Sequence, residues 1–253
     1  MKVRNFLTAG MAVLALGACN KDNQTSGGGG DAPASTVQIT QANPPPGGTW
    51  ADVTNATSAG GFMMGNPNAK VKLVEIGSLF CPVCKRFADE GVPTLVNDYV
   101  KTGKISWEFR PYIIHGPIDM AANLVARCNG PKTFFPIAEA LYRDQSTLLG
   151  KMEATPQDKL QQLQQLPPEQ EFVQFASIMG LQDWAAARGL PQAKANQCLS
   201  DQKMINNEVQ LTSDVNNNYP EFKGTPSFIL NGKLLPDTAN WAALKPQLEA
   251  AVK

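Results

Sequence analysis

The segment KVKLVEIGSLFCPVCKRF, residues 70–87, decides the fold. Its apolar residues between positions 71 and 76 form a short β-rich run, which predicts a buried strand. Beyond this run the apolar residues change to helical spacing, and Cys81 and Cys84 lie where the pattern changes. Pro82 suits the first turn of a helix. The segment therefore predicts a strand followed by a helix that begins at a Cys-x-x-Cys pair.

This placement indicates what the cysteine pair can do. The sulfur of Cys81 would face the unpaired N–H groups at the helix start, which favour a thiolate over a thiol. Cys84 would lie one turn on, on the same face and more buried, so it could close onto Cys81 as a disulfide. A nucleophilic thiolate backed by a second thiol is what thiol–disulfide exchange requires.

The alternatives to a redox couple are a structural zinc site and a permanent structural disulfide. A structural zinc site needs four ligands, usually from a second Cys-x-x-Cys or a His pair, but the chain has a single histidine, His115, and no second pair. We therefore predict no metal site. A permanent structural disulfide across Cys-x-x-Cys is possible but strained. The position of the pair favours a redox couple.

The rest of the chain predicts a mixed order of elements. The helix after Cys81 should end near Gly103 and be interrupted at Pro93, and residues 105–114 predict a second strand. Residues 116–218 show helical spacing only, with candidates at 118–129, 133–145, 155–166, 168–179, 181–188, 191–200 and 201–217. A hairpin is predicted at 226–235 around Asn231-Gly232, and an amphipathic helix ends the chain.

The N-terminal region predicts export. Residues 1–18 have a short basic start and an apolar run too short to span a bilayer. The ending LGAC, residues 16–19, resembles the bacterial lipoprotein box, which would make Cys19 an acylated N-terminus; the alternative is plain secretion with a free Cys19. Residues 19–48 are polar and rich in Gly and Pro, which predicts a flexible tether. The folded part should begin between residues 50 and 62.

Composition excludes few function classes. The 253 residues are 43% hydrophobic and 17% charged with a formal net charge of zero, and no dense Lys/Arg run suggests a nucleic-acid partner. The length allows one core with an insertion.

Two segments carry a resemblance to a known family. MGNPNAKVKLVEIGSLFCPVC, residues 64–84, and KGTPSFILNGK, residues 223–233, resemble the DsbA-like branch of the thioredoxin superfamily. The resemblance implies an α/β protein, a thioredoxin fold with an inserted helical domain. The expected parts are a signal peptide at 1–18, a tether at 19–48, a thioredoxin-like domain at 49–115 and 219–253, and the helical insertion domain at 116–218.

The resemblance also implies roles for single residues. Cys81 corresponds to the exposed nucleophile and Cys84 to the buried resolving thiol. Pro226 corresponds to a cis-proline that faces the disulfide, and with Thr225 it would pair with an extended substrate backbone. Pro82 and Val83 are expected to contact substrate.

Two further positions bear on the redox chemistry. Glu75 corresponds to a buried acid that could exchange protons with Cys84; the alternative is a strand-edge charge that faces water. Val83 replaces the histidine of the Cys-Pro-His-Cys found in strongly oxidising members. This loss of ~1–2 kcal/mol of thiolate stabilisation would make the potential more reducing by roughly 20–45 mV, which weakens the oxidase interpretation without overturning it.

The remaining cysteines lie in the helical region. Cys128 and Cys198 are expected on neighbouring helices, and two leftover thiols in an oxidising compartment more often pair than stay free; some DsbA-like proteins carry a second disulfide there. The alternative is two separate buried thiols. His115 is expected to be a surface or cap residue.

Together these observations predict a lipid-anchored thiol:disulfide oxidoreductase on the periplasmic side of the bacterial envelope. An oxidase acting on exported proteins with thiols is favoured, and a membrane partner, such as a quinone-linked reoxidant, would reoxidise it. The alternatives are a reductase or isomerase fed by a membrane electron donor, and a non-enzymatic Cu(I)-binding lipoprotein. No cofactor and no nucleic-acid partner are expected, and the protein should be a monomer.

Overall fold

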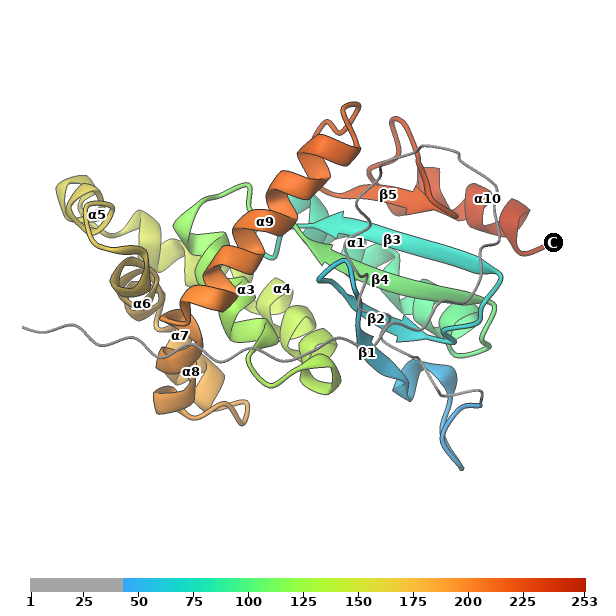
Figure 1. The fold of residues 1–253 in the computed structure, drawn as a ribbon, viewed down its shortest axis with the longest axis horizontal. Coiled ribbons are helices and arrows are strands. Elements are labelled where there is room, and N and C mark those ends of the chain that lie inside the picture. The colour runs from blue at the N-terminus through green and yellow to red at the C-terminus, as the bar shows by residue number, and fades with distance from the viewer. Residues whose placement is uncertain (1–42) are drawn as a thin grey trace, which may run out of the picture. The chain divides into compact units, whose positions relative to one another are not determined.

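A computed structural model describes residues 43–253 (Figure 1). The predicted signal peptide, the lipidation site Cys19 and most of the predicted tether lie outside the described residues.

A mixed sheet forms the centre of the described chain. Its strands are β1 (Thr54–Ala56), β2 (Phe62–Gly65), β3 (Val71–Gly77), β4 (Ile105–Pro111), β5 (Ser227–Leu230) and β6 (Lys233–Leu234). They lie in the order β1-β2-β4-β3-β5-β6, and only β3 and β4 run parallel. Strand β3 has neighbours on both sides, which fits its nearly continuous apolar sequence.

A helical crossover joins β3 to β4, as parallel neighbours require. Helix α1 (Pro82–Glu90) begins just beyond the carboxyl end of β3. It is followed by the short α2 (Val92–Thr94), which contains Pro93, and by the π-helical segment η2 (Leu95–Val100). The interruption predicted at Pro93 is therefore present, with the break two residues earlier at Gly91.

A block of helices separates β4 from β5. It comprises α3 (Pro117–Arg127), α4 (Pro131–Glu153), α5 (Gln157–Leu163), α6 (Pro168–Met179), α7 (Leu181–Ala186), α8 (Gln192–Leu199) and α9 (Gln202–Asn218). Figure 1 shows α5–α8 gathered away from the sheet, with α9 running back to it. The chain ends in α10 (Trp241–Ala251). The predicted α/β class, a thioredoxin fold with an inserted helical domain, is confirmed.

Three elements differ from the sequence prediction. Strands β1 and β2 were not predicted, and they form a hairpin that pairs with β4; a short 3-10 turn at Trp50–Asp52 precedes them. Helix α4 extends to Glu153 rather than to Gln145, and it includes Pro136 near its start. The polar stretch after Gln145 stays helical because Leu148 and Met152 continue its buried face.

The hairpin predicted at Asn231-Gly232 is present between β5 and β6. Both turn residues have positive φ, 49° at Asn231 and 84° at Gly232, the conformation that two-residue hairpin loops favour. The Asn231 side chain also accepts a hydrogen bond of 2.8 Å from the Lys72 backbone N–H. This contact ties the turn to β3.

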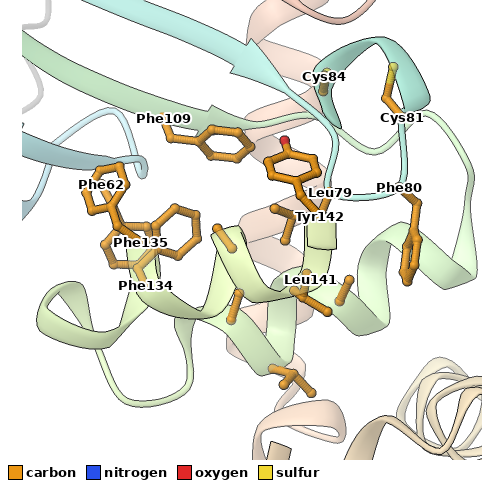
Figure 2. Packing of buried hydrophobic residues seen from close by; sticks show 14 of the residues in the cluster. Phe62, Leu79, Phe80, Cys81, Cys84, Phe109, Phe134, Phe135, Leu141 and Tyr142 are labelled. Carbon is orange, nitrogen blue, oxygen red and sulfur yellow. The ribbon is translucent and has the colours of Figure 1, made fainter. Parts of the chain in front are cut away.

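Aromatic side chains fill the space between the sheet and α4 (Figure 2). The rings of Phe62 and Phe134 stack with centroids 4.2 Å apart, and Phe109 and Phe134 lie 5.5 Å apart. Burying each such side chain contributes roughly 1.5–3 kcal/mol. On the opposite face of the sheet, Ile76 packs against Val215 of α9. The two faces therefore hold α4 and α9 against the sheet, whose strand β3 leads into the cysteine pair.

A buried ion pair joins the helices α3 and α9. Arg127 Nε lies 2.5 Å from Glu208 Oε1, and the Glu208 side chain is fully buried. Arg127 also donates to the carbonyl oxygen of Gly60 and lies over the ring of Phe62. Burial raises the pKa of Glu208 to about 7, and Arg127 opposes that rise. No sequence pattern had marked this pair.

Candidate redox site

The two cysteines lie at the start of α1 (Figure 2). Cys81 is the residue that caps the helix, Pro82 follows in the first turn, and Cys84 lies one turn on. The Lys85 backbone N–H donates to the Cys81 carbonyl oxygen at 3.0 Å, the first bond of the helix ladder. The two sulfurs are not joined in a disulfide in this structure.

Exposure of the pair differs from the prediction in one respect. Cys84 is fully buried, as expected, but Cys81 is only 6% exposed, so the prediction of an exposed nucleophile is wrong for this conformation. The cause is the chain segment before β5, where the carbonyl oxygen of Thr225 lies 3.3 Å from Cys81 Sγ. Pro82 and Val83 are the exposed residues of this turn.

The two thiols have opposite pKa shifts. The pKa of Cys81 falls from 9.0 to about 5, and the largest cause is a hydrogen bond from the Cys84 thiol. The Thr225 side chain lowers it further, as do the backbone N–H groups of Cys84 and Val83, while burial opposes the shift. Burial raises the pKa of Cys84 well above its usual range, and the hydrogen bond to Cys81 adds to the rise. Cys81 is therefore a thiolate at neutral pH and Cys84 is a thiol.

The order of these causes changes the explanation of the reactive sulfur. The sequence predicted that N–H groups at the helix start ionise Cys81. These groups do contribute, but less than the Cys84 thiol does. Cys84 is thus both the second sulfur of the pair and the main stabiliser of the first.

The Thr225–Pro226 segment lies directly against Cys81. The peptide bond between these residues is cis, and Pro226 is buried. The Thr225 hydroxyl is buried without a hydrogen-bond partner of normal geometry, so it is free to donate to the Cys81 thiolate. The structure thus brings together residues that are 144 positions apart in the sequence.

Glu75 lies in the middle of β3 and is 1% exposed, so the alternative of an edge carboxylate facing water is excluded in this structure. Burial raises its pKa to about 8; Trp107 opposes this shift and the charge on Cys81 adds to it. The charge on Glu75 in turn raises the pKa of Cys84. The carboxyl is therefore electrostatically linked to both cysteines.

A buried acid that the sequence did not mark organises the other side of the turn. Asp119 Oδ1 accepts hydrogen bonds from Ser78 Oγ at 2.8 Å and from the Phe80 N–H at 3.2 Å. Its other oxygen accepts from the Ile114 and His115 N–H groups at 3.0 and 2.8 Å. The only local sequence signal for this role is spacing. Asp119 lies in the first turn of α3, so its carboxylate can accept hydrogen bonds from the N–H groups of residues 114 and 115 just before the helix.

His115 is a surface residue, as expected, but it is not isolated. Its Nδ1 lies 3.1 Å from Asp119 Oδ2 and 3.4 Å from Ser78 Oγ. The hydrogen bond with Asp119 raises the pKa of His115, and the Cys81 charge adds to the rise. His115 is not among the groups that lower the pKa of Cys81.

Two side chains of α4 hold the active-site turn from below. Tyr142 donates to the Ser78 carbonyl oxygen at 3.1 Å, and Gln145 Nε2 donates to the carbonyl oxygens of Leu79 and Cys81 at 3.1 and 3.3 Å. The sequence reasoning missed both. The only signal for them was a tyrosine and a glutamine three positions apart on the apolar face of a predicted helix.

The other two described cysteines lie apart from this site. Cys128, at the end of α3, and Cys198, in α8, form a disulfide with their Cα atoms 5.8 Å apart. Of the alternatives left open by the sequence, the structure shows the bridge rather than two separate thiols.

Residues 43–253 contain neither a metal-binding cluster nor a membrane-spanning helix. These residues contain no group of three or more His, Cys, Asp or Glu side chains that could hold a metal ion. Within the same range, no helix has both the length and the apolar character needed to cross a membrane.

Comparisons with known proteins agree with this geometry. A family model described as thioredoxin matches residues 57–250. A Rickettsia bellii protein named for protein-disulfide oxidoreductase activity is 26% identical over 68% of this chain and 57% of its own length. Disulfide bond formation protein D of Bacillus subtilis is 22% identical over 76% of this chain and 77% of its own. This chain thus spans little more than half the length of the rickettsial relatives it matches.

Solved structures extend the comparison. A protein-disulfide isomerase from Novosphingobium aromaticivorans has a TM-score of 0.71 and 31% identity, covering 80% of this chain and 99% of that one. The alpha-DsbA1 of Wolbachia pipientis, at 19% identity, has a TM-score of 0.59 over 75% of this chain and 89% of that one, a likeness in fold.

Proposed function

The chain belongs to the thioredoxin family, in its DsbA-like branch, and on this premise we propose that it is a thiol:disulfide oxidoreductase that introduces disulfides into exported proteins. The observation that carries the proposal is the opposite ionisation of two neighbouring sulfurs. Cys81 has a pKa of about 5 and Cys84 one well above its usual range. A stable thiolate makes the reduced pair the favoured product, which makes its disulfide an oxidant.

The reaction starts from the Cys81–Cys84 disulfide. A substrate thiolate attacks Cys81 Sγ, a mixed disulfide forms, and Cys84 leaves as a thiolate that takes up a proton. A second substrate thiolate then attacks the substrate sulfur of the mixed disulfide and releases Cys81 as a thiolate. The substrate gains one disulfide and loses two electrons, and the enzyme pair gains them.

The surroundings of the pair give each neighbour a part in this reaction. Glu75 is buried with a pKa of about 8, so it can hold the proton that Cys84 gains or loses. The Thr225–Pro226 segment offers backbone groups next to Cys81 on which an extended substrate can pair. Pro82 and Val83 are the exposed part of the turn and would contact the substrate beside the reacting sulfur.

A reductase or isomerase working with a membrane electron donor is the second candidate. Two observations favour it: Val83 stands where strongly oxidising members have histidine, and the 31% identical structure is named a protein-disulfide isomerase. The ionisation of Cys81 argues for the oxidase. Its pKa of about 5 is lower than the value of roughly 7 for the reductant thioredoxin and is shifted toward the value of roughly 3.5 for the oxidant DsbA.

The reduction potential decides between the two. We expect the Cys81–Cys84 pair, equilibrated with glutathione buffers, to lie between about −120 and −200 mV, on the oxidising side of the range from DsbA to thioredoxin. A value near −270 mV would transfer the assignment to the reductase. Alkylation of free thiols in intact cells should find the pair mostly oxidised.

Trapping tests the nucleophile. Cys84→Ala should accumulate mixed disulfides with exported proteins through Cys81, because no second thiol resolves them. The matched variant Cys81→Ala should accumulate far fewer, since Cys84 is fully buried. Equal trapping by both variants would refute the assignment of Cys81 as the attacking sulfur.

We further propose that the protein is held on the periplasmic side of the envelope by acylated Cys19 and works as a monomer with a membrane redox partner. The sequence LGAC at residues 16–19 supports the anchor. Cys19→Ser should move the protein from the membrane fraction to the soluble fraction. Retention of this variant on membranes would refute the anchor.

A further inference from the structure

A cavity of about 610 Å³ lies between the sheet and the helices α1, α2 and α4. Its walls are largely apolar and include Val96, Phe109, Phe135 and Tyr142; Figure 2 shows the last three from close by. Cavities of roughly 300–1,000 Å³ with apolar walls and a few polar groups are typical of small-molecule sites. The cavity lies on the same face of the sheet as the cysteine pair but is separate from the Thr225–Pro226 segment.

Two polar side chains line this cavity without hydrogen-bond partners. Glu75, from β3, is 1% exposed and Trp107, from β4, is 6% exposed. Trp107 lies close enough to Glu75 to lower its pKa as a hydrogen-bond donor, but neither Glu75 Oε2 nor Trp107 Nε1 has a hydrogen-bond partner of normal geometry. Most buried polar atoms in folded proteins are satisfied, so two that line one cavity need an explanation. The indole N–H is a donor only, and the carboxyl is a second donor when it is protonated. Both groups therefore call for an acceptor.

The charged residues around the cavity disfavour a charged ligand. Lys85 pairs with Asp89 at 2.6 Å and Arg143 pairs with Glu139 at 3.5 Å, so the four charged residues that line the cavity outside the sheet neutralise one another. A charged ligand would lose its hydration without gaining an unpaired partner, which is costly in a buried site.

We propose that this cavity binds a small, uncharged, amphipathic molecule whose carbonyl-type oxygen accepts hydrogen bonds from Trp107 and Glu75. The apolar body of the molecule lies against Val96, Phe135 and Tyr142.

Binding is linked to the redox pair through Glu75. An occupant that accepts a hydrogen bond from Glu75 favours its protonated form, and the Cys81 thiolate does the same. The occupant should therefore bind the dithiol form severalfold more tightly than the disulfide form at pH 8, and by reciprocity it should make the pair more oxidising. This linkage rests on the proposed exchange function, whereas the binding site itself does not.

The test uses 4-phenylbutan-2-one as the probe and butylbenzene, which lacks the carbonyl, as its match. The full chain contains four tryptophans, so its ¹⁵N-labelled indole N–H resonances can be assigned with Trp107→Phe. We expect the ketone to shift the Trp107 resonance in a saturable way and to leave the other three unmoved. Butylbenzene should bind roughly tenfold more weakly or worse, because it makes neither hydrogen bond.

Matched variants test the location. Ala138 is buried and lines the cavity, so Ala138→Phe should abolish the shift, whereas Ala186→Phe, at an exposed position of α7, should not. Should Ala138→Phe fail to fold, Glu75→Leu provides the second variant, and ketone binding should weaken toward that of butylbenzene, because only the Trp107 hydrogen bond remains.

Absence of a saturable Trp107 shift, or a shift that survives Ala138→Phe, would overturn the proposal and leave water as the occupant of the cavity. Equal affinity for the dithiol and disulfide forms would overturn the linkage. Disulfide exchange is measured on the same samples: loss of exchange with binding intact refutes the proposed function alone, and the converse refutes this site alone.

Discussion

Replacement of Cys84 by alanine tests why Cys81 is ionised. The hydrogen bond from the Cys84 thiol is the largest cause of the low Cys81 pKa, ahead of the backbone N–H groups of Val83 and Cys84. The alanine variant removes the thiol and keeps the helix and its N–H groups. Cys84→Ser keeps a hydroxyl that can donate to the sulfur, so it is the matched control.

The size of the effect follows from the value of a hydrogen bond to a charged group. Such a bond contributes about 1.5–3 kcal/mol, and one pKa unit corresponds to ~1.4 kcal/mol. The pKa of Cys81, about 5 with Cys84 in place, should therefore rise by roughly 1–2 units in Cys84→Ala. In Cys84→Ser it should rise less, because the donor is still present.

The assay follows thiolate absorbance at 240 nm against pH in a Cys19→Ser background, in which Cys128 and Cys198 stay bridged. A variant that lacks both Cys81 and Cys84 supplies the baseline. The rate of alkylation by iodoacetamide gives an independent titration. If Cys81 in Cys84→Ala still titrates near its wild-type value, the backbone N–H groups suffice and the role assigned to the Cys84 thiol is refuted.

Three other predictions concern stability. The pKa of Glu75 is raised from 4.5 to about 8 in the folded state. The stability that Glu75 contributes is therefore fully present below its unfolded pKa and is lost as the pH rises through 8, so between pH 4.5 and 8 the free energy of unfolding of Glu75→Gln, measured in urea, should gain about 4–5 kcal/mol relative to wild type. A pH-independent difference would refute the buried-acid assignment. Arg127→Met should cost ~3 kcal/mol or more at pH 8 and less at pH 5, where Glu208 can be protonated; equal costs at both pH values would contradict this. Replacing both Cys128 and Cys198 with serine should cost up to about 4 kcal/mol and leave disulfide exchange intact, and a loss of exchange in the folded variant would show that the bridge has more than a structural part.

The centre of the fold could be predicted because its signals are local. The change from strand to helical spacing at Cys81 marks both the end of β3 and the start of α1, and the hairpin at Asn231-Gly232 follows from the two residues that adopt positive φ. Strands β1 and β2 were not predicted because they are short, and two of the three residues of β1 are polar. They exist because they pair with each other and with β4, a contact that no local pattern reports.

The site was predictable only in its sulfur chemistry. The burial of Cys81 depends on Thr225, which is 144 positions away, and the support of the turn by Asp119 and Tyr142 depends on helices packed from the insert. The apolar neighbours of Glu75 place it in a buried strand. The lack of a hydrogen-bond partner for its Oε2, however, depends on the cavity between α4 and the sheet, beside Trp107.

The disulfide between Cys128 and Cys198 spans 70 positions and encloses α4 to α7. A protease that cut the exposed chain around α5 would leave Cys81 on one peptide and Pro226 on the other. Those two peptides would stay linked as one molecule on a non-reducing gel and separate only after reduction. A nicked chain could therefore keep Cys81 next to Pro226. A gel run without reductant would overstate the amount of uncut protein.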